Sequence, residues 1–395
     1  MEKKYSFKYM LTLMLIASAL TCFIMTILFL FLSKYSKNNS GYVNDYATLL
    51  DMIDELYIGE YDEDEITASA MKATIESLND GWSYYLTPEE YAEFLDVSNN
   101  RFAGIGVGVI TDEASGGMYV EYVYKGSAAE LAGIVTGDVI IAIDGEDIQG
   151  ETVEDMRGRL YRPIGDNVDL TILRPDGNIV TMSVVYDYVF VDPVSSELID
   201  SKTGYIEISN FDHGASQSFI SSVDELIEQG TDAFIFDVRE NGGGMVLEMT
   251  GMLDYLLPEG EIFVAVDKDG VETTTESNPE MIEIKCVVLV DRYSYSAAEY
   301  FAATLSEYGF ATIVGEQTSG KSRMQTTFRM PGGGALHIST SQYLTKNRVS
   351  LHDVGGLKPD YKIVLNDEEF KLLVSGNLEK ADDPQIQMAL DLLKR

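Results

Sequence analysis

The chain has 395 residues, with 65 aspartates and glutamates against 28 lysines and arginines, and its formal net charge is −37 at pH 7. This length is enough for two or three domains with buried cores. The negative charge excludes nucleic acid and anionic lipid surfaces as expected partners, because both would be repelled. The three histidines and two cysteines show no ligand spacing, so we expect neither a metal site nor a disulfide framework.

The N-terminus carries an apolar segment between lysines. Residues 10–32 contain no charged side chain, whereas three lysines precede them and two follow closely. A segment of 23 residues is long enough to span a bilayer and too long for the apolar part of a signal peptide. The sequence predicts a single-pass membrane anchor over 10–32. The lysine excess before it favours residues 1–9 in the cytoplasm and the remaining chain outside the cell membrane.

Residues 33–98 form a predicted helical region. Apolar side chains recur at helical spacing between Tyr42 and Leu95. Within this region, Thr87-Pro88-Glu89-Glu90 is typical of a helix start, with proline at the first helical position.

Residues 99–188 form a predicted small β-rich module. Its first strand, RFAGIGVGVI at 101–110, is interrupted by glycines. This segment lacks the G-x-G-x-x-G spacing and enters a strand, which argues against a dinucleotide site. The order of the motifs resembles a PDZ domain, a fold that adds an extended peptide to its sheet and holds the terminal carboxylate on backbone N–H groups. The resemblance implies that proteins or peptides are bound by their C-termini, at a loop made of Gly104, Ile105, Gly106 and Val107.

Residues 189–395 predict an α/β domain. From Thr203 onward apolar strands alternate with amphipathic helices, and Gly242–Gly244 separate a buried strand from a helix expected over Met245–Leu257. Consecutive glycines let backbone N–H groups face a ligand, as in an oxyanion-binding site. A tight turn with positive φ explains them equally well, and both interpretations are open at this point.

The stretch Asp291–Gln325 follows an apolar strand and predicts a turn, a helix over 297–308 and a second strand. Ser296 lies where the turn enters the helix, and Lys321 follows 25 residues later in a glycine-containing loop. A serine hydroxyl needs a base to become a nucleophile, and a lysine whose pKa is lowered can be that base. If the segment is extended, the amide of Gln325 could orient the amine. The alternative is a helix-capping serine and a surface lysine.

Arg323 allows two interpretations. In an extended segment it lies on the same face as Lys321, about 6–7 Å away by strand rise. A fixed positive charge at that distance would lower the pKa of the lysine. Alternatively, the strand twists and Arg323 pairs with one of the many surface carboxylates.

Three segments together resemble the C-terminal-processing (tail-specific) peptidases, a family of Ser–Lys endopeptidases. SYSAAE and GEQTSGKSRMQ are similar to the family motifs S-A-S-A-S-E and G-E-x-T-x-G-K-G-x-x-Q, and DVRENGGG is similar to its D-L-R-x-N-x-G-G loop. The departures within these motifs are Ala298 and Ser322. DGWSYYLTPEE is similar to a further family segment, D-P-x-S-x-Y-L-T-P-E-E, and has Gly81-Trp82 in place of the proline and its neighbour. The resemblance implies an α/β serine-peptidase core built of βα units like those of crotonases and Clp proteases, with an inserted PDZ domain.

The resemblance also implies roles for individual residues. The catalytic residues would be Ser296 as nucleophile, Lys321 as base and Gln325 as the group that holds the amine. The N–H groups of Gly244 and Ala297 would form the oxyanion hole. No metal and no cofactor are implied.

The sequence therefore predicts a membrane-anchored serine endopeptidase that recognises protein C-termini, and it leaves homo-oligomer formation open. The alternative is a catalytically inactive, membrane-anchored PDZ scaffold, although such proteins usually lose a reacting residue and none is missing here. A Ser–Lys esterase would need an S-x-x-K helix, which is absent around the serine. A histidine base is disfavoured because His213, His337 and His352 have no spacing that ties them to the serine.

Overall fold

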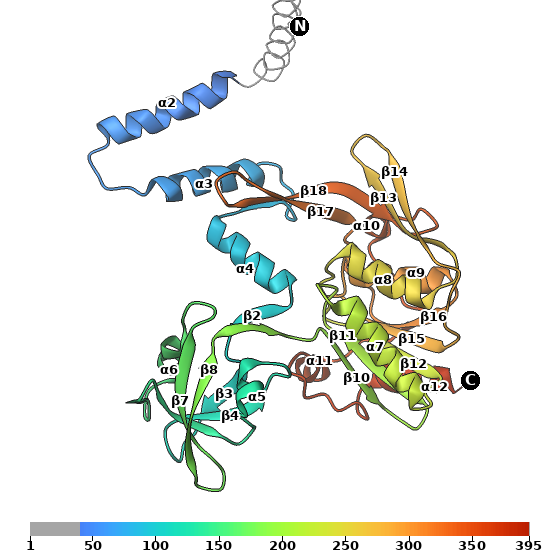
Figure 1. Cartoon of the computed structure of the whole chain (residues 1–395). Helices are drawn as coiled ribbons and strands as arrows, with labels where there is room; N and C mark the ends of the chain where they lie inside the picture. The colour runs from blue at the N-terminus through green and yellow to red at the C-terminus, as the bar shows by residue number, and fades with distance from the viewer. Residues whose placement is uncertain (1–39, 395) are drawn as a thin grey trace, which may run out of the picture. The chain divides into compact units, whose positions relative to one another are not determined.

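The computed structural model describes residues 40–394 (Figure 1). These residues fall into two units, with the boundary between Ser69 and Ala70. The described part of the first unit consists of α2 (Ser40–Leu56) and the beginning of α3 (Glu63–Glu76), in the region predicted to be helical. Within residues 40–394, no helix combines the length and the apolar character that crossing a bilayer requires. The anchor predicted over 10–32 lies outside the described residues.

A short strand interrupts the predicted helical region. β1 (Tyr84–Leu86) pairs antiparallel with β18 (Ala335–Leu344), so that a strand forms where a helix was expected. The pairing partner lies far away in sequence, which is why local periodicity did not indicate it. α4 (Pro88–Ser98) begins as predicted. The Thr87 hydroxyl accepts a hydrogen bond from the Glu90 N–H, and the Glu90 carboxylate accepts one from the Thr87 N–H.

The β-rich module forms a sheet with its own core. The sheet has the order β3-β4-β5-β7-β8, with β6 paired to β5. Its buried apolar side chains form a cluster separate from that of the peptidase core. β2 and β9 pair antiparallel, so the segments that enter and leave the module lie side by side. The elements are β2 (Arg101–Gly104), β3 (Val107–Thr111), β4 (Met118–Val123), α5 (Ala128–Ala132), β5 (Val139–Ile143), β6 (Glu146–Asp147), α6 (Val153–Leu160), β7 (Asn167–Leu173), β8 (Ile179–Val185) and β9 (Asp187–Phe190).

The predicted α/β domain is built on a six-stranded sheet with the order β10-β11-β12-β15-β16-β19. All neighbours are parallel except the β10–β11 pair. The two central strands are apolar except at Asp237 and Lys285, because both faces of the sheet are covered, and one buried cluster lies on each face. The strands are β10 (Val194–Leu198), β11 (Thr203–Ile208), β12 (Ala233–Asp237), β15 (Lys285–Val290), β16 (Ala311–Gly315) and β19 (Tyr361–Lys362). The helices are α7 (Ala215–Glu228), α8 (Val246–Leu256), α9 (Ala297–Glu307) and α12 (Pro384–Leu393).

A second, antiparallel sheet joins distant parts of the chain. Its order is β1-β18-β13-β14, and β17 pairs with β18. The remaining elements are β13 (Gly260–Asp267), β14 (Glu272–Ser277), β17 (Arg323–Arg329), α10 (Leu351–Val354) and α11 (Asp367–Val374). This sheet brings the segment before α4 to the strand that follows Lys321.

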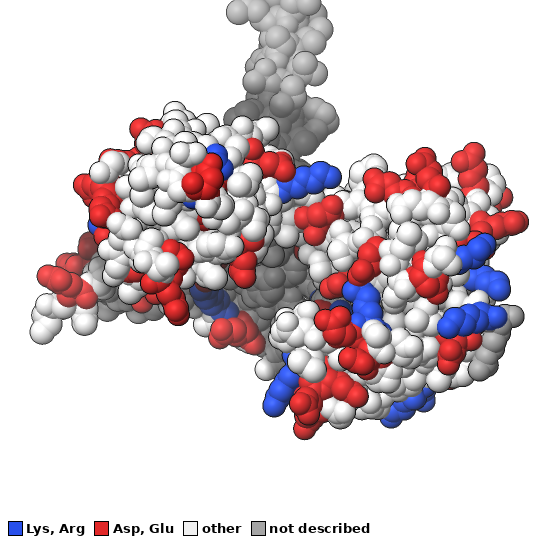
Figure 2. Space-filling view, turned by 90° about the horizontal axis from the view of Figure 1, so that it is seen from below, with Lys and Arg blue, Asp and Glu red and all other residues white. Residues whose placement is uncertain are grey.

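The surface agrees with the composition. In Figure 2, aspartates and glutamates spread over the visible face, and lysines and arginines lie between them in small groups.

Parallel strands end at one edge of a sheet, so the loops after β12 and β15, which are neighbours, leave it together. These loops contain the glycine triplet and Ser296.

Candidate active site

Ser296 lies at the start of α9 in a strained backbone conformation. Its φ is 58° and its ψ is −124°, a region that residues with a side chain rarely occupy. The preceding turn is fixed by Ser294, whose buried hydroxyl donates to the Val238 carbonyl at 2.6 Å, and by Asp291, whose carboxylate accepts from the Ser294 N–H at 2.9 Å. The surrounding turn thus maintains the strain, and Ser296 itself remains partly accessible.

The glycine loop packs directly against this turn. A Cβ added to Gly243, whose φ is +91°, would lie 2.8 Å from the Ser296 Cβ and 2.9 Å from the Ala297 nitrogen. The loop is held by the buried Asn241, which donates to the Ile208 carbonyl at 2.6 Å and accepts from the Gly243 N–H at 2.8 Å. Only glycine fits at position 243, because a side chain there would collide with the serine.

The two predicted oxyanion donors lie in this contact region. Gly244 is attached to Gly243 and has a φ of +146°, and Ala297 is the first residue of α9. Within residues 40–394, neither the Gly244 N–H nor the Ala297 N–H donates a hydrogen bond to another group. Both donors are therefore available to a ligand, and their role as an oxyanion hole stays a prediction.

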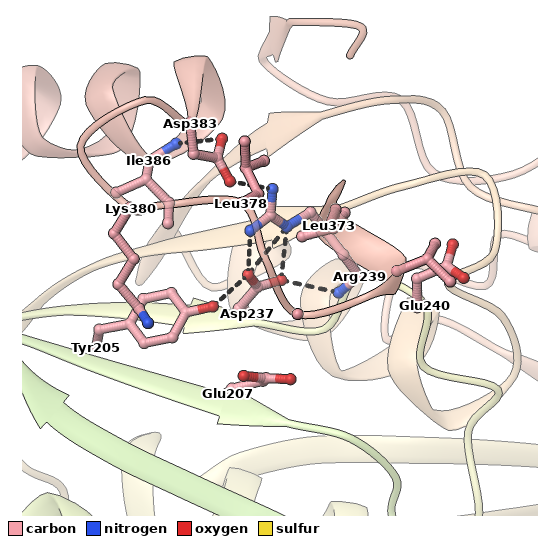
Figure 3. Close-up of a pocket in the computed structure, with 12 residues that line it drawn as sticks. Tyr205, Glu207, Asp237, Arg239, Glu240, Leu373, Leu378, Lys380, Asp383 and Ile386 are labelled. Atoms are coloured by element: carbon pink, nitrogen blue, oxygen red, sulfur yellow. Dashed lines mark hydrogen bonds and ion pairs between the residues drawn. The ribbon is translucent and has the colours of Figure 1, made fainter. Parts of the chain in front are cut away.

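A buried ion-pair network precedes the glycine loop (Figure 3). Arg239 Nε lies 2.9 Å from Asp237 Oδ1, and its Nη1 lies 2.7 Å from Asp383 Oδ2, at the start of α12. All three side chains are buried, and these carboxylates raise the pKa of Arg239 although burial opposes the charge. The network anchors the end of β12, so the glycine loop leaves the sheet from a fixed point. A cavity of about 230 Å³ adjoins it, and none of the predicted site residues lines that cavity.

Glu299 joins the two candidate catalytic residues. Its carboxylate is fully buried and accepts from the N–H of Ser296 at 3.1 Å and from the N–H of Lys321 at 2.9 Å. Burial raises its pKa, and hydrogen bonds from Thr318, Gly320, Lys321 and Ser296 oppose that rise. The sequence interpretation assigned no role to Glu299. The available signal was the spacing Ser296-x-x-Glu299, which is typical of a capping box.

Lys321 lies in the loop before β17, as predicted, and the extended segment begins only at Arg323. Its side chain is partly buried, and burial lowers its pKa to about 8 against the opposite effect of the Asp80 and Glu299 carboxylates. The Nζ atom lies 4.0 Å from the centre of the Trp82 ring and 5.7 Å from that of Tyr295. Within residues 40–394 this nitrogen has no ion pair with a carboxylate and no hydrogen bond to Ser296. A lysine in this state can give up its proton near neutral pH.

Arg323 makes the second of the two contacts considered above, whereas Gln325 makes different contacts from the one expected. Arg323 is exposed and pairs with Asp80, with 3.2 Å between Nη1 and Oδ1, so pairing with a carboxylate is the interpretation that the structure supports. Burial, and not Arg323, lowers the pKa of Lys321. The Gln325 amide donates to the Arg323 carbonyl and to Ser339 Oγ, each at 3.0 Å. No hydrogen bond between the Gln325 side chain and the lysine amine occurs in the described structure.

Tyr343 and the histidines are the remaining groups considered around Ser296 and Lys321. Tyr343 is buried and donates to the Lys321 carbonyl at 2.7 Å, which fixes the backbone of the lysine loop. Burial raises the pKa of Tyr343, and a contact with Ser296 opposes the rise. In the described part of the chain, none of the three histidines hydrogen-bonds to Ser296. His337 pairs with Thr327, with 2.8 Å between Nδ1 and the hydroxyl oxygen.

The predicted carboxylate loop of the β-rich module borders a groove. Gly104 ends β2, Ile105 is buried, Gly106 has a φ of +89°, and Val107 begins β3. A Cβ on Gly106 would lie 2.2 Å from the Ser127 Cβ, so this position requires glycine. The groove has a volume of about 340 Å³ and lies among the loop, β3 and the face of α6 that carries Arg157 and Leu160. Peptide binding at these four residues stays a prediction.

Relatives among known proteins cover most of this chain. A model of peptidase family S41 matches residues 202–363, and a PDZ domain model matches residues 119–174. The carboxy-terminal processing protease CtpA of Bacillus subtilis is 30% identical over 337 residues, which cover 85% of this chain and 70% of the relative. A carboxyl-terminal-processing protease of Synechocystis is 29% identical over 335 residues, 83% of this chain and 77% of the relative. A crystal structure from Bacteroides fragilis assigned to the S41 proteases has a TM-score of 0.50 at 19% identity, over 82% of this chain and 90% of that one, and agrees in fold. The chain therefore belongs to the carboxyl-terminal-processing serine peptidases of family S41, with a PDZ domain.

Proposed function

We propose that the peptidase works with a Ser296–Lys321 dyad. The observation that carries the proposal is the buried Glu299 carboxylate, which binds the backbone N–H groups of both residues and so holds the two loops together. The lowered pKa of Lys321, about 8, supports its role as a base. At pH 7 roughly a tenth of such a lysine is neutral, which is enough for general-base catalysis.

In this mechanism, neutral Lys321 takes the proton of the Ser296 hydroxyl while the Oγ atom attacks the carbonyl carbon of the scissile peptide bond. The negative charge then develops on the carbonyl oxygen, where the N–H groups of Gly244 and Ala297 stabilise it. The lysine ammonium returns its proton to the leaving amine, and the acyl group stays on the serine. Water deprotonated by Lys321 then releases the acyl group. Each oxyanion donor contributes about 3–4 kcal/mol in comparable sites.

The PDZ domain supplies substrates to this site by their C-termini. The backbone N–H groups of the Gly104–Val107 loop bind the terminal carboxylate, and the peptide extends along β3. The substrates are proteins or peptides with a free C-terminus, and nucleic acid is not a partner of so acidic a chain. Residues 10–32 anchor the protein in the cell membrane with its peptidase domain outside.

The test is cleavage by the full-length chain of a peptide library with free C-termini, read by mass spectrometry. Ser296→Ala should abolish cleavage. The matched control Ser306→Ala changes a serine on the same helix whose side chain has no partner in the described residues, and should leave cleavage unchanged. Equal activity of Ser296→Ala would refute the dyad. Absence of cleavage together with intact peptide binding would instead favour the inactive scaffold.

A further inference from the structure

Trp82 contacts the amine of Lys321. The Nζ atom lies 4.0 Å from the ring centre, within the range of cation–π attraction, for which tryptophan is the strongest partner. Tyr295 is a second ring near the amine, with its ring centre 5.8 Å from that of Trp82 and 5.7 Å from Nζ. The proposed base is therefore bound by two aromatic rings. One of them comes from a segment more than two hundred residues away in sequence.

The turn that carries Trp82 is fixed to the second sheet. The Asp80 carboxylate accepts from the Ser83 hydroxyl at 2.6 Å and from the Trp82 N–H at 3.3 Å. The Ser83 hydroxyl accepts from the Ser339 N–H at 3.0 Å, and Ser339 Oγ accepts from the Gln325 amide at 3.0 Å. These bonds connect Gln325 through two serines to the turn, and they give Gln325 a role that does not require contact with the lysine.

The charged and titratable groups around the Lys321 amine shift its pKa in opposite directions. The Asp80 and Glu299 carboxylates favour the ammonium form, and burial disfavours it. Arg323 pairs with Asp80 and is not among the groups that shift the pKa of Lys321. The pKa of His337 is lowered by burial and by the charge of Lys321. Tyr343 is held neutral by burial. An aromatic face adds a preference for the ammonium over the neutral amine, because the ring quadrupole attracts a cation.

We propose that Trp82 is a positioning residue, whose indole ring binds the Lys321 ammonium and holds the amine in a resting position away from Ser296. This inference rests on the proposed dyad. Deprotonation removes most of the attraction to the ring, so the neutral amine is released to reach the serine hydroxyl. The turn 80–83, where the family motif has proline and this chain has Gly81-Trp82, thereby controls when the base is available.

The contact can be tested without measuring activity, because Trp82 is the single tryptophan of the chain. The tryptophan fluorescence of the full-length protein is recorded from pH 5 to pH 9.5. We expect one transition with a midpoint near pH 8, where Lys321 titrates. The transition should disappear in Lys321→Met and persist in His337→Gln, which removes the other nearby titrating group. Identical curves for the wild type and Lys321→Met would overturn the proposal.

The second test uses kcat/KM as a function of pH, whose acidic limb reports the base of the free enzyme. Trp82→Leu keeps an apolar cover but removes the aromatic face, so the lysine loses its proton more easily and the limb moves to lower pH. A shift of about half to one pH unit is expected, with a smaller shift for Trp82→Phe. A limb that stays in place, or moves to higher pH, would mean that the ring only shields the lysine.

The two proposals can fail separately. If Lys321→Met still cleaves peptides while its fluorescence transition is lost, the dyad is wrong and the Trp82 contact stands. If Lys321→Met is inactive but its fluorescence shows the same pH dependence as that of the wild type, the dyad stands and the proposed binding of the amine by Trp82 is wrong. Thermal denaturation of each variant checks that it is folded.

Discussion

The two glycine loops of this protein differ in how firmly they are held. The peptidase loop is supported by buried side chains, with Asn241 bonded on both sides and the Arg239 network at its base. The Gly104–Val107 loop is held mainly through its backbone, since Gly106 O accepts from the Tyr124 N–H at 3.0 Å and Ile105 O accepts from the Ala129 N–H at 2.9 Å.

The difference corresponds to what each loop is proposed to do. An oxyanion hole must keep its donors within tenths of an ångström of one developing charge, and rigid buried support provides this. A peptide groove accepts many sequences through shared backbone bonds, so an open edge with backbone anchoring is sufficient. Substitutions at the first loop should therefore affect catalysis, and substitutions at the second should affect binding.

The largest effect is expected at the proposed dyad. Ser296→Ala and Lys321→Met should each reduce kcat by a factor of about 10⁴ or more, and the double variant should lose no more, because the residues act as a unit. Peptide binding to the PDZ domain, measured by fluorescence anisotropy, should stay unchanged. The exposed Lys285→Met serves as control. Losses that multiply in the double variant would contradict a shared step.

The peptidase loop should be the next most sensitive position. Gly243→Ala places a methyl group 2.8 Å from the Ser296 Cβ and displaces the loop, so kcat should fall by a factor of about 10²–10³. Gly230→Ala is the matched control, because Gly230 has a φ of +93° but no atom within 4 Å of an added Cβ. The Gly230→Ala variant therefore has the same kind of backbone strain as Gly243→Ala but no collision with another side chain. Equal losses for both variants would assign the effect to strain alone.

The PDZ loop should respond in binding rather than in turnover. Gly106→Ala meets Ser127 at 2.2 Å and should weaken binding of a peptide with a free C-terminus about tenfold or more, with kcat preserved. Gly165→Ala, in the same module with a φ of +93° and open space around it, is the control. Amidation of the peptide should weaken its binding to the wild type similarly. If the acid and the amide bind alike, the loop recognises something other than a carboxylate.

The smallest expected effect is a change in the free energy of unfolding, caused by Asp212 beside the peptidase loop. Asp212 lies beside Gly244, and burial followed by the Glu248 charge raises its pKa to about 6. Because the folded-state pKa is above the ordinary value of 3.8, the protonated form favours folding at low pH, and this stability is lost as pH rises from about 4 to 6. Asp212→Asn should therefore be more stable than the wild type above pH 6, by on the order of 1–2 kcal/mol. Denaturant titrations at pH 4 and pH 7.5 measure the difference, which should be small at the lower pH.

Local sequence patterns determined most of the elements. The helix start at Thr87 and the helix that begins at Ala297 lie where proline, capping residues and apolar periodicity predicted them. The motifs around Ser296 and Lys321 were sufficient to recognise the family, because each motif specifies a short backbone arrangement.

Tertiary structure decided which side chains meet. β1 became a strand only because β18 offers it an edge, and that pairing brings Trp82 to Lys321. Nothing in the periodicity of residues 42–95 indicated this contact. Likewise, Gln325 bonds to Ser339 and Arg323 pairs with Asp80, since the hydrogen-bond and charge partners come from other elements.

The difference between what the sequence determined and what the tertiary structure decided has a physical reason. Helix caps, glycine turns and apolar alternation depend on residues within a few positions of one another, so the sequence alone determines them. The protonation of Lys321 depends on burial and on groups that only folding brings near it, among them Asp80, Glu299 and the Trp82 ring. The sequence identified the residues that can react, and the packing of two distant segments determined the state in which the lysine is held.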